Sequence, residues 1–205
     1  MKLHTGIGPN PRVVHIFLAE KGVVLERETV DVMAGENRQE PYLARNPAGQ
    51  VPCLELDDGS TLTEITAICE YLEEVHPEPP LIGTTPEERG ATRMWTRRID
   101  LNIIEPIGHG FRFGPGLELF KNRIHVIPQA AEDFQQIAQE KLAWLDGLVG
   151  DREFIAGNRF TLADILLFAF LEFGAQVGQP LDAKLENLPG WYTRVAARPS
   201  VEDSR

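Results

Sequence analysis

A proline-rich segment divides this chain of 205 residues into two parts whose hydrophobic patterns differ. The segment is His76-Pro77-Glu78-Pro79-Pro80, and a run of prolines favours an extended, semi-rigid linker. Before it, the alternation typical of strands is interspersed with helical spacing, whereas after it helical spacing predominates. We therefore expect two domains, residues 1–77 with an α/β fold and residues 86–205 with an all-α fold.

The first part has the pattern of a small α/β domain. Its expected elements are a strand at 2–5, a helix at 12–21 that Gly22 ends, a strand within 24–32, a weak helix at 39–45, a hairpin at 53–63 and a helix at 65–75. The hairpin is the clearest of these, because an Asp-Gly pair lies between its two strands. The resulting order is β-α-β-α-β-β-α.

The second part predicts helices at 87–112, 128–149 and 162–173, and a short helix that begins at Pro189 and stops before Pro199. Pro106 lies inside the first of them, where we expect a kink or a break. Thr161 and Asp164 have the spacing of a capping box for the helix that follows. This assignment is favoured over a catalytic acid for Asp164.

Composition excludes several classes of protein. The formal net charge of -11 would repel a phosphate backbone, so nucleic acid and anionic membranes are not expected partners. The longest apolar run, residues 162–173, is too short to cross a bilayer and contains Asp164 and Glu172. Because the N-terminus has no apolar signal region, a cytoplasmic location is expected.

The two cysteines do not have the spacing of a metal site or of a disulfide framework. Cys53 and Cys69 lie 16 residues apart, and zinc sites need closely spaced ligands. We expect both cysteines to be structural and no metal to be bound.

Several motifs resemble those of the cytosolic glutathione transferases. They are Asn46-Pro47-Ala48-Gly49-Gln50-Val51-Pro52, Leu62-Thr63-Glu64-Ile65-Thr66-Ala67-Ile68, Gly157-Asn158-Arg159-Phe160-Thr161-Leu162-Ala163-Asp164 and the terminal Arg198-Pro199-Ser200. They occur in order over essentially the whole chain, so the resemblance is more specific than any single motif. It is closest to bacterial members of the beta and theta type.

The resemblance implies a thioredoxin-like N-terminal domain, an all-helical C-terminal domain and usually a homodimer. It implies glutathione as co-substrate, bound by the first domain, and a small electrophile held by the second. The chain is thus expected to be a detoxifying transferase.

The resemblance also implies which residues hold glutathione. Pro52 is expected to be cis and to leave the backbone of Val51 free to pair with the peptide, as an added strand would. Glu64 is expected to hold the γ-glutamyl ammonium. Ile65 stands where the family usually has Ser, so its backbone N–H remains but the hydroxyl is lost, and weaker binding is expected.

A second group of residues is expected at the other end of glutathione. The segment Gly35-Glu36-Asn37-Arg38-Gln39 resembles one that grips the glycine carboxylate. Arg38 suits this role, because a guanidinium can take a carboxylate with two parallel hydrogen bonds. Asn37 is included with it, and Gln50 is a neighbour in the same role. An exposed arginine without function is the alternative.

Asn10 aligns with the position at which this family activates the thiol, where beta-type members have Cys. Its amide could donate to the thiolate from the start of the first helix. Alternatively, Asn10 is simply the N-cap of that helix, and the two roles are compatible because the amide has both an acceptor and donors. Thr5, the nearest other hydroxyl in sequence, is the rival donor, and a backbone amide is a further one.

His109 resembles a histidine of the beta-type site. It is expected in a loop after Pro106 and, with Phe111, Arg112, Phe113 and Phe120, beside the second substrate. The expected function is conjugation of the glutathione thiolate to a small hydrophobic electrophile. The alternatives are a glutathione-dependent disulfide or peroxide reductase, or a non-catalytic binding protein that keeps the fold.

Overall fold

The computed structural model describes residues 1–204 and divides them into two compact units. The first contains Met1–Leu81 together with residues 199–204, and the second is Ile82–Arg198. The helical domain was expected to span residues 86–205, but residues 199–204 do not belong to the second unit. They form a short helix, α10 (Pro199–Asp203), which belongs with the first unit and was not expected from the sequence.

The first unit has a four-stranded sheet with the order β2-β1-β3-β4. The strands are β1 (Lys2–Thr5), β2 (Glu26–Thr29), β3 (Cys53–Glu55) and β4 (Thr61–Leu62). Strands β1 and β2 are parallel, and the other pairs are antiparallel, with Leu54 opposite Leu62 in the hairpin. The thioredoxin-like fold class is thereby confirmed, although β2 is shorter than the expected 24–32.

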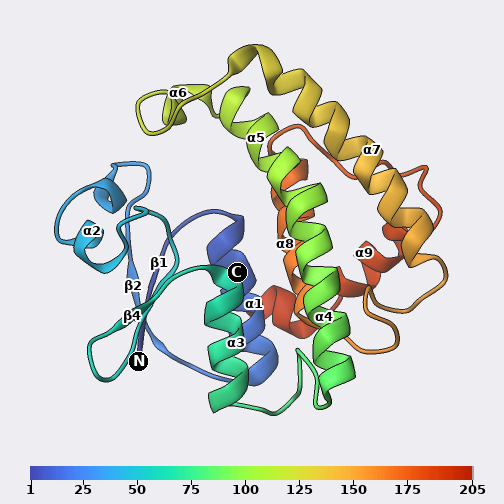
Figure 1. Ribbon diagram of the computed structural model, residues 1–205, viewed down its shortest axis with the longest axis horizontal. Helices are drawn as coiled ribbons and strands as arrows, with labels where there is room; N and C mark the ends of the chain where they lie inside the picture. The colour runs from blue at the N-terminus through green and yellow to red at the C-terminus, as the bar shows by residue number, and fades with distance from the viewer. Residues whose placement is uncertain (205) are drawn as a thin grey trace. The chain divides into compact units, whose positions relative to one another are not determined.

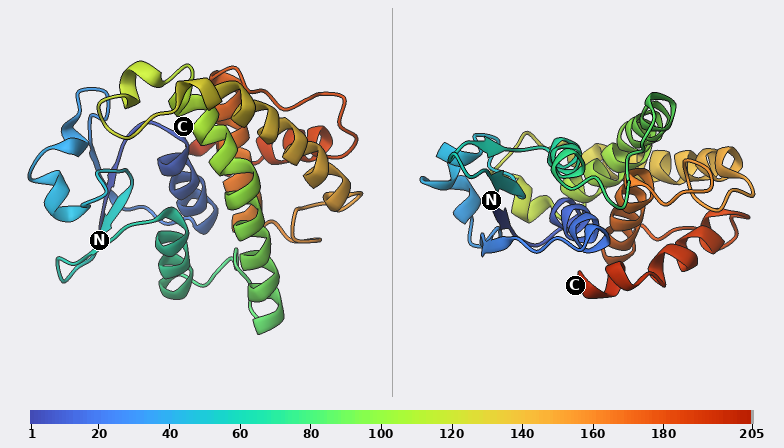
Figure 2. Two further views of the ribbon diagram at one scale, coloured as in Figure 1. Left: turned by 45° about the horizontal axis from the view of Figure 1, so that its top comes forward. Right: turned by 90° about the horizontal axis from the view of Figure 1, so that it is seen from below.

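Two helices, α1 (Pro9–Lys21) and α3 (Ile65–Val75), lie together on one side of the strands (Figures 1 and 2). Their apolar stripes supply the core with Phe17, Leu18, Ile68 and Leu72, which are almost completely buried. On the other side lie the short helices η1 (Glu36–Arg38) and α2 (Tyr42–Arg45). The Cys69 thiol is buried in the α3 stripe, as the helical spacing of the sequence predicted.

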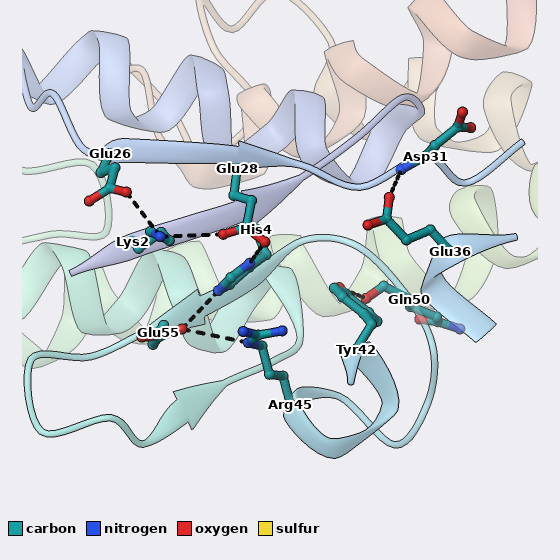
Figure 3. A network of polar contacts seen from close by, with 10 residues as sticks. All are labelled: Lys2, His4, Glu26, Glu28, Asp31, Glu36, Tyr42, Arg45, Gln50 and Glu55. Atoms are coloured by element: carbon teal, nitrogen blue, oxygen red, sulfur yellow. Dashed lines mark hydrogen bonds and ion pairs between the residues drawn. The ribbon is translucent and has the colours of Figure 1, made fainter. Parts of the chain in front are cut away.

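The sheet face that α2 covers has a network of charged side chains (Figure 3). Lys2 forms ion pairs with Glu26 and Glu28, and the Nε2 atom of His4 lies 2.9 Å from the Glu55 carboxylate. Because β2 is an edge strand with every residue exposed, these charges protect the edge against pairing with another chain.

The linker after α3 is fixed to the first unit. The buried Lys21 side chain forms an ion pair with Glu73 and donates to the carbonyl of Pro79 at 2.6 Å. Glu73 in turn accepts from the Leu81 N–H. A buried ion pair needs such additional partners, because they replace the water that both groups lose.

The second unit is all-helical, as expected. Its elements are α4 (Pro86–Ile99), η2 (Asp100–Ile104), α5 (Glu105–Phe113), α6 (Leu117–Phe120), η3 (Pro128–Ala130), α7 (Ala131–Val149), α8 (Leu162–Gln176) and α9 (Leu188–Ala196). Helix α8 is buried along most of its length and contacts α4 and α9, while α5 contacts α7. The disturbance expected at Pro106 is the π-helical turn η2, which lies just before it. Pro106 therefore lies in the first turn of α5, where the N–H group that proline lacks costs little stability.

The capping box of α8 is present. Thr161 accepts from the N3 backbone, and Asp164 accepts from the N–H of Thr161 at 2.9 Å. Asp164 also accepts from the Ile155 N–H and from the indole of Trp191. All of these groups are buried, so Asp164 is structural, as the spacing predicted.

Candidate functional site

A small pocket lies in the first unit, beside the first residues of α1 and α3 and the segment that leads into β3. It has about 270 Å³ of empty volume, which includes space open to solvent, and is lined by Asn10, Asn46, Gln50, Val51, Pro52, Glu64 and Ile65. All except Asn46 were predicted from the sequence to contact glutathione. The fold brings them together because two helices begin at the same end of the sheet.

Asn10 lies within the first turn of α1 and not at its cap. The N-cap is Gly8, with φ of 119° and no side-chain cap, so the alternative role of Asn10 as the N-cap is wrong. Pro9 occupies the start of the helix instead, where its fixed φ is favourable. Within residues 1–204 the half-buried Asn10 amide makes no hydrogen bond, and both its donors are available to the pocket.

Thr5, the rival donor, is engaged elsewhere. Its hydroxyl lies 2.8 Å from Nε2 of His15 on α1, is buried and does not line the pocket. Burial, together with the positive charges of Arg27 and Arg12, lowers the pKa of His15 to about 4. His15 is therefore neutral near pH 7, and the pair ties the end of β1 to α1.

The start of α3 forms a second wall of the pocket. Glu64 is the N-cap of this helix and has a φ of 64°. Among residues 1–204 it is the only non-glycine residue with a positive φ. Such a conformation is strained and is characteristic of functional sites. Ile65 is the first residue of α3, so its N–H has no partner within the helix. Thr66, which could have replaced the missing Ser hydroxyl, does not line the pocket.

The third wall is the segment before β3. The Val51–Pro52 peptide bond is cis, as the resemblance implied. Gln50 is exposed, whereas Val51 and Pro52 are buried. Within the described part of the chain, the backbone N–H groups of Gln50 and Val51 make no hydrogen bond. Two backbone donors are thus available at this wall.

Asn37 and Arg38 do not line the pocket. Asn37 is buried and donates to the carbonyl of Gly49 at 2.6 Å, while Arg38 donates to the carbonyl of Ala48 at 3.2 Å. The structure therefore places Asn37 as a support beneath the segment rather than at its surface. Its contact with glutathione stays a prediction, since Asn37 is 4% exposed and lies outside the pocket lining.

Sequence reasoning missed Asn46 as a site residue. Its Oδ1 accepts from the Ala48 N–H and its Nδ2 donates to the Gln50 carbonyl at 2.7 Å. The signal was available, because an Asn before a Pro favours a turn in which the side chain binds the backbone two residues on.

His109 lies in the second unit, within α5 and not in the loop that was expected. Its ring packs between Phe113 and Phe134, with centroids 5.2 and 4.9 Å away. Its Nδ1 atom is 3.5 Å from the Glu105 carboxylate one turn earlier. Phe111 packs against both Phe120 and Phe173, so α5 carries an aromatic cluster on more than one side.

The chemistry of the pocket follows from its donors. Cys53 and Cys69 are both buried and free, and burial raises the pKa of each thiol, so neither supplies a thiolate there. Among residues 1–204, no cluster of His, Cys, Asp and Glu could hold a metal ion. None of the described helices is long and apolar enough to cross a membrane. The pocket instead offers amide donors, helix N-termini and one carboxylate, which suit a zwitterionic peptide.

Comparisons with known proteins identify both parts of the chain. The family model described as "Glutathione S-transferase, N-terminal domain" matches residues 7–75, and that described as "Glutathione S-transferase, C-terminal domain" matches residues 111–199. Glutathione S-transferase 2 of Saccharomyces cerevisiae is 35% identical over 97% of this chain and 86% of its own length.

Two solved structures extend the similarity to the fold. A glutathione S-transferase domain-containing protein of Marinobacter aquaeolei is 38% identical, with a TM-score of 0.89 over 98% of this chain and 100% of its own. Gtt2 of Saccharomyces cerevisiae is 32% identical, with a TM-score of 0.92 over 100% of both chains.

Proposed function

The chain belongs to the glutathione S-transferase family, and from this premise we propose that it conjugates the glutathione thiolate to a small hydrophobic electrophile. It is a transferase of this family and uses glutathione as its co-substrate. The observation that carries the proposal is the pocket of the first unit, where Asn10 meets the residues suited to hold a peptide.

The pocket suits the charged ends of glutathione. The Glu64 carboxylate would hold the γ-glutamyl ammonium, and the Ile65 N–H with the N-terminus of α3 would hold the neighbouring carboxylate. The Val51 backbone would pair with the middle of the peptide. The exposed Gln50, together with the Arg38 guanidinium, would take the glycine carboxylate.

Asn10 would stabilise the thiolate. A free thiol has a pKa near 8.5 and is mostly protonated near pH 7. Each unit by which the enzyme lowers this pKa requires about 1.4 kcal/mol of preferential stabilisation of the thiolate. The Asn10 amide donates from the N-terminal turn of α1, where the helix dipole also favours a negative charge. The thiol proton leaves to solvent, and the sulfur lone pair then forms a bond to the electrophilic carbon. In a substitution the leaving group departs with the electrons of the broken bond, and in an addition the double-bond electrons take up a proton from solvent.

The second substrate is proposed to lie against the aromatic cluster of α5. The half-buried rings of Phe111 and Phe120 offer an apolar surface, and the half-buried His109 ring, packed on the buried Phe113, offers one with a polar edge. Such a surface suits an aromatic or otherwise apolar electrophile. A homodimer, usual for relatives of this type, is also part of the proposal.

Disulfide reduction is the second candidate, and Asn10 argues against its usual route. Asn cannot form a mixed disulfide with glutathione, as a Cys at this position could. Product analysis separates the two activities, because conjugation consumes glutathione and forms a thioether, whereas reduction forms glutathione disulfide.

Removing the Asn10 amide tests the proposal. Asn10→Ala is expected to bind glutathione with an affinity within about threefold of the wild type, because the other contacts remain. Its bound thiol should titrate about one pKa unit higher, since a hydrogen bond to a charged group contributes on the order of 1.5 kcal/mol or more. Calorimetry measures the affinity, and thiolate absorbance measures the pKa. Asn10→Ser restores a donor and is the matched control.

Two results would count against the proposal. No detectable glutathione binding by the wild-type protein would overturn the function. An unchanged thiol pKa in Asn10→Ala, with binding intact, would overturn only the role of Asn10.

A further inference from the structure

Three consecutive carbonyl groups in the segment before β3, those of residues 48–50, accept hydrogen bonds from side chains that precede them in the sequence. The Ala48 carbonyl accepts from Arg38 at 3.2 Å, and the Gly49 carbonyl accepts from Nδ2 of Asn37 at 2.6 Å. The Gln50 carbonyl accepts twice, from the Tyr42 hydroxyl at 2.5 Å and from Nδ2 of Asn46 at 2.7 Å. Figure 3 shows the Tyr42 ring directed at Gln50. A single carbonyl with two side-chain donors is held in one orientation.

The orientation of this carbonyl decides where the next amide points. The Gln50–Val51 peptide bond is trans, and in a trans peptide the C=O and N–H point in opposite directions. Because Tyr42 and Asn46 hold the carbonyl, the Val51 N–H is directed away from both of them. That N–H makes no hydrogen bond within residues 1–204, and Val51 lines the pocket.

Burial makes this arrangement rigid. Asn37, Tyr42 and Asn46 are each no more than 4% exposed. Water therefore cannot readily replace their hydrogen bonds, and rotation of any of these side chains would leave a buried polar group unpaired. Burial also raises the pKa of the Tyr42 hydroxyl, which keeps it protonated and able to donate.

We propose that Tyr42 and Asn46 are positioning residues that hold the Gln50–Val51 peptide so that the Val51 N–H meets the backbone of glutathione. Asn37 supports the same segment one peptide earlier. This inference rests on the proposed function, since it assigns the Val51 amide to glutathione. Neither Tyr42 nor Asn37 touches the ligand, and both act through the backbone of residues 49–51.

A double-mutant cycle on glutathione binding tests this arrangement. Tyr42→Phe removes one donor and keeps the ring, and Asn46→Ala removes the other. In the wild-type background Asn46 still holds the Gln50 carbonyl after Tyr42→Phe. This substitution should therefore raise the KM for glutathione only about twofold. In the Asn46→Ala background it should raise KM about tenfold. The kcat at saturating glutathione should stay within about twofold, because Asn10 and the thiolate are unaffected.

Thr61→Val is the control for a structural loss alone. Thr61 donates from β4 to the Arg45 carbonyl at 2.9 Å, at the end of α2, and does not line the pocket. Its removal should lower the melting temperature and leave the KM for glutathione unchanged.

The outcomes separate this inference from the proposed function. If the wild-type protein binds glutathione but Tyr42→Phe has the same effect in both backgrounds, the positioning role is wrong. A KM increase of equal size in Thr61→Val also overturns it. Should the double variant fail to fold, Tyr42→Phe alone decides, and an unchanged KM refutes the proposal. Absence of binding by the wild type overturns the proposed function, and this inference with it.

Discussion

Ile65 is a departure from the usual residue at the start of α3. The family's Ser would offer a hydroxyl to the α-carboxylate of glutathione, whereas the Ile65 side chain cannot donate. Ile65→Ser should therefore tighten glutathione binding by about tenfold, the effect of a hydrogen bond of about 1.4 kcal/mol to a charged group. Calorimetric titration with glutathione measures this change.

Ile65→Val is the matched control for that experiment. It shortens the side chain without adding a donor, so its affinity should stay near that of the wild type. If Val and Ser tighten binding equally, the cause is steric and not the hydroxyl.

His15 makes stability depend on pH. Its pKa is about 4 in the folded protein because of burial and the nearby Arg27 and Arg12, against 6.5 when unfolded. Between these values the unfolded chain binds a proton that the folded protein excludes, so stability is complete above pH 6.5 and falls as the pH drops toward 4. His15→Gln, which can keep a hydrogen bond to Thr5, should show a smaller loss of melting temperature over this window.

His125→Gln is the comparison, because His125 is exposed. It should follow the wild type at each pH. If the melting temperatures of the wild type and of His15→Gln fall by the same amount from pH 7 to pH 4, His15 is not the group that causes the pH dependence.

At the scale of elements, the start of α9 depends on a side chain from α7. Asp146 accepts from the backbone N–H groups of Asn187 at 2.9 Å and Leu188 at 2.7 Å, and also from that of Glu186. Burial alone would raise the pKa of Asp146, but these N–H groups outweigh it and leave the pKa below its ordinary value. The carboxylate thus caps a helix from a distant part of the sequence.

Asp146→Ala should lower the free energy of unfolding by about 2–4 kcal/mol, because it leaves the buried Leu188 N–H and the part-buried N–H groups of Glu186 and Asn187 without their acceptor. Denaturant unfolding measures the loss. Asp151→Ala, at an exposed position just after α7, should change stability by no more than about 0.5 kcal/mol. Equal effects of the two substitutions would contradict the capping role.

At the scale of the whole molecule, α1 and α10, which are far apart in sequence, contact each other within the first unit. Arg12 on α1 donates to the Ser204 hydroxyl at 2.6 Å and to the Val201 carbonyl at 2.7 Å. Val201 is 1% exposed, so α10 contributes to the core of the unit that the N-terminal residues begin.

Val201→Ala should therefore lower the free energy of unfolding by about 1–2 kcal/mol through the loss of buried methyl groups. Val24→Ala is the matched control, because Val24 is 93% exposed and its truncation should change little. Thermal unfolding of both variants measures the difference, and equal melting temperatures would show that α10 adds nothing to this core.

Much of the fold could be predicted from local patterns. The Asp-Gly hairpin, the apolar stripe of α3 and the capping box of α8 each depend on residues close in sequence. The family motifs then identified the pocket residues Gln50, Val51, Pro52, Glu64 and Ile65.

Other features could not be found in this way, because they depend on residues far apart in the chain. The sequence alone determined the fold class, the family and every residue of the pocket lining except Asn46, since spacing and motifs are local. Only the tertiary structure decided that Asn37 is buried beneath the pocket, that Thr5 is paired with His15 and that α10 belongs with α1. Burial and hydrogen-bond partners arise only when distant segments pack together, and these set which donors remain available to a ligand.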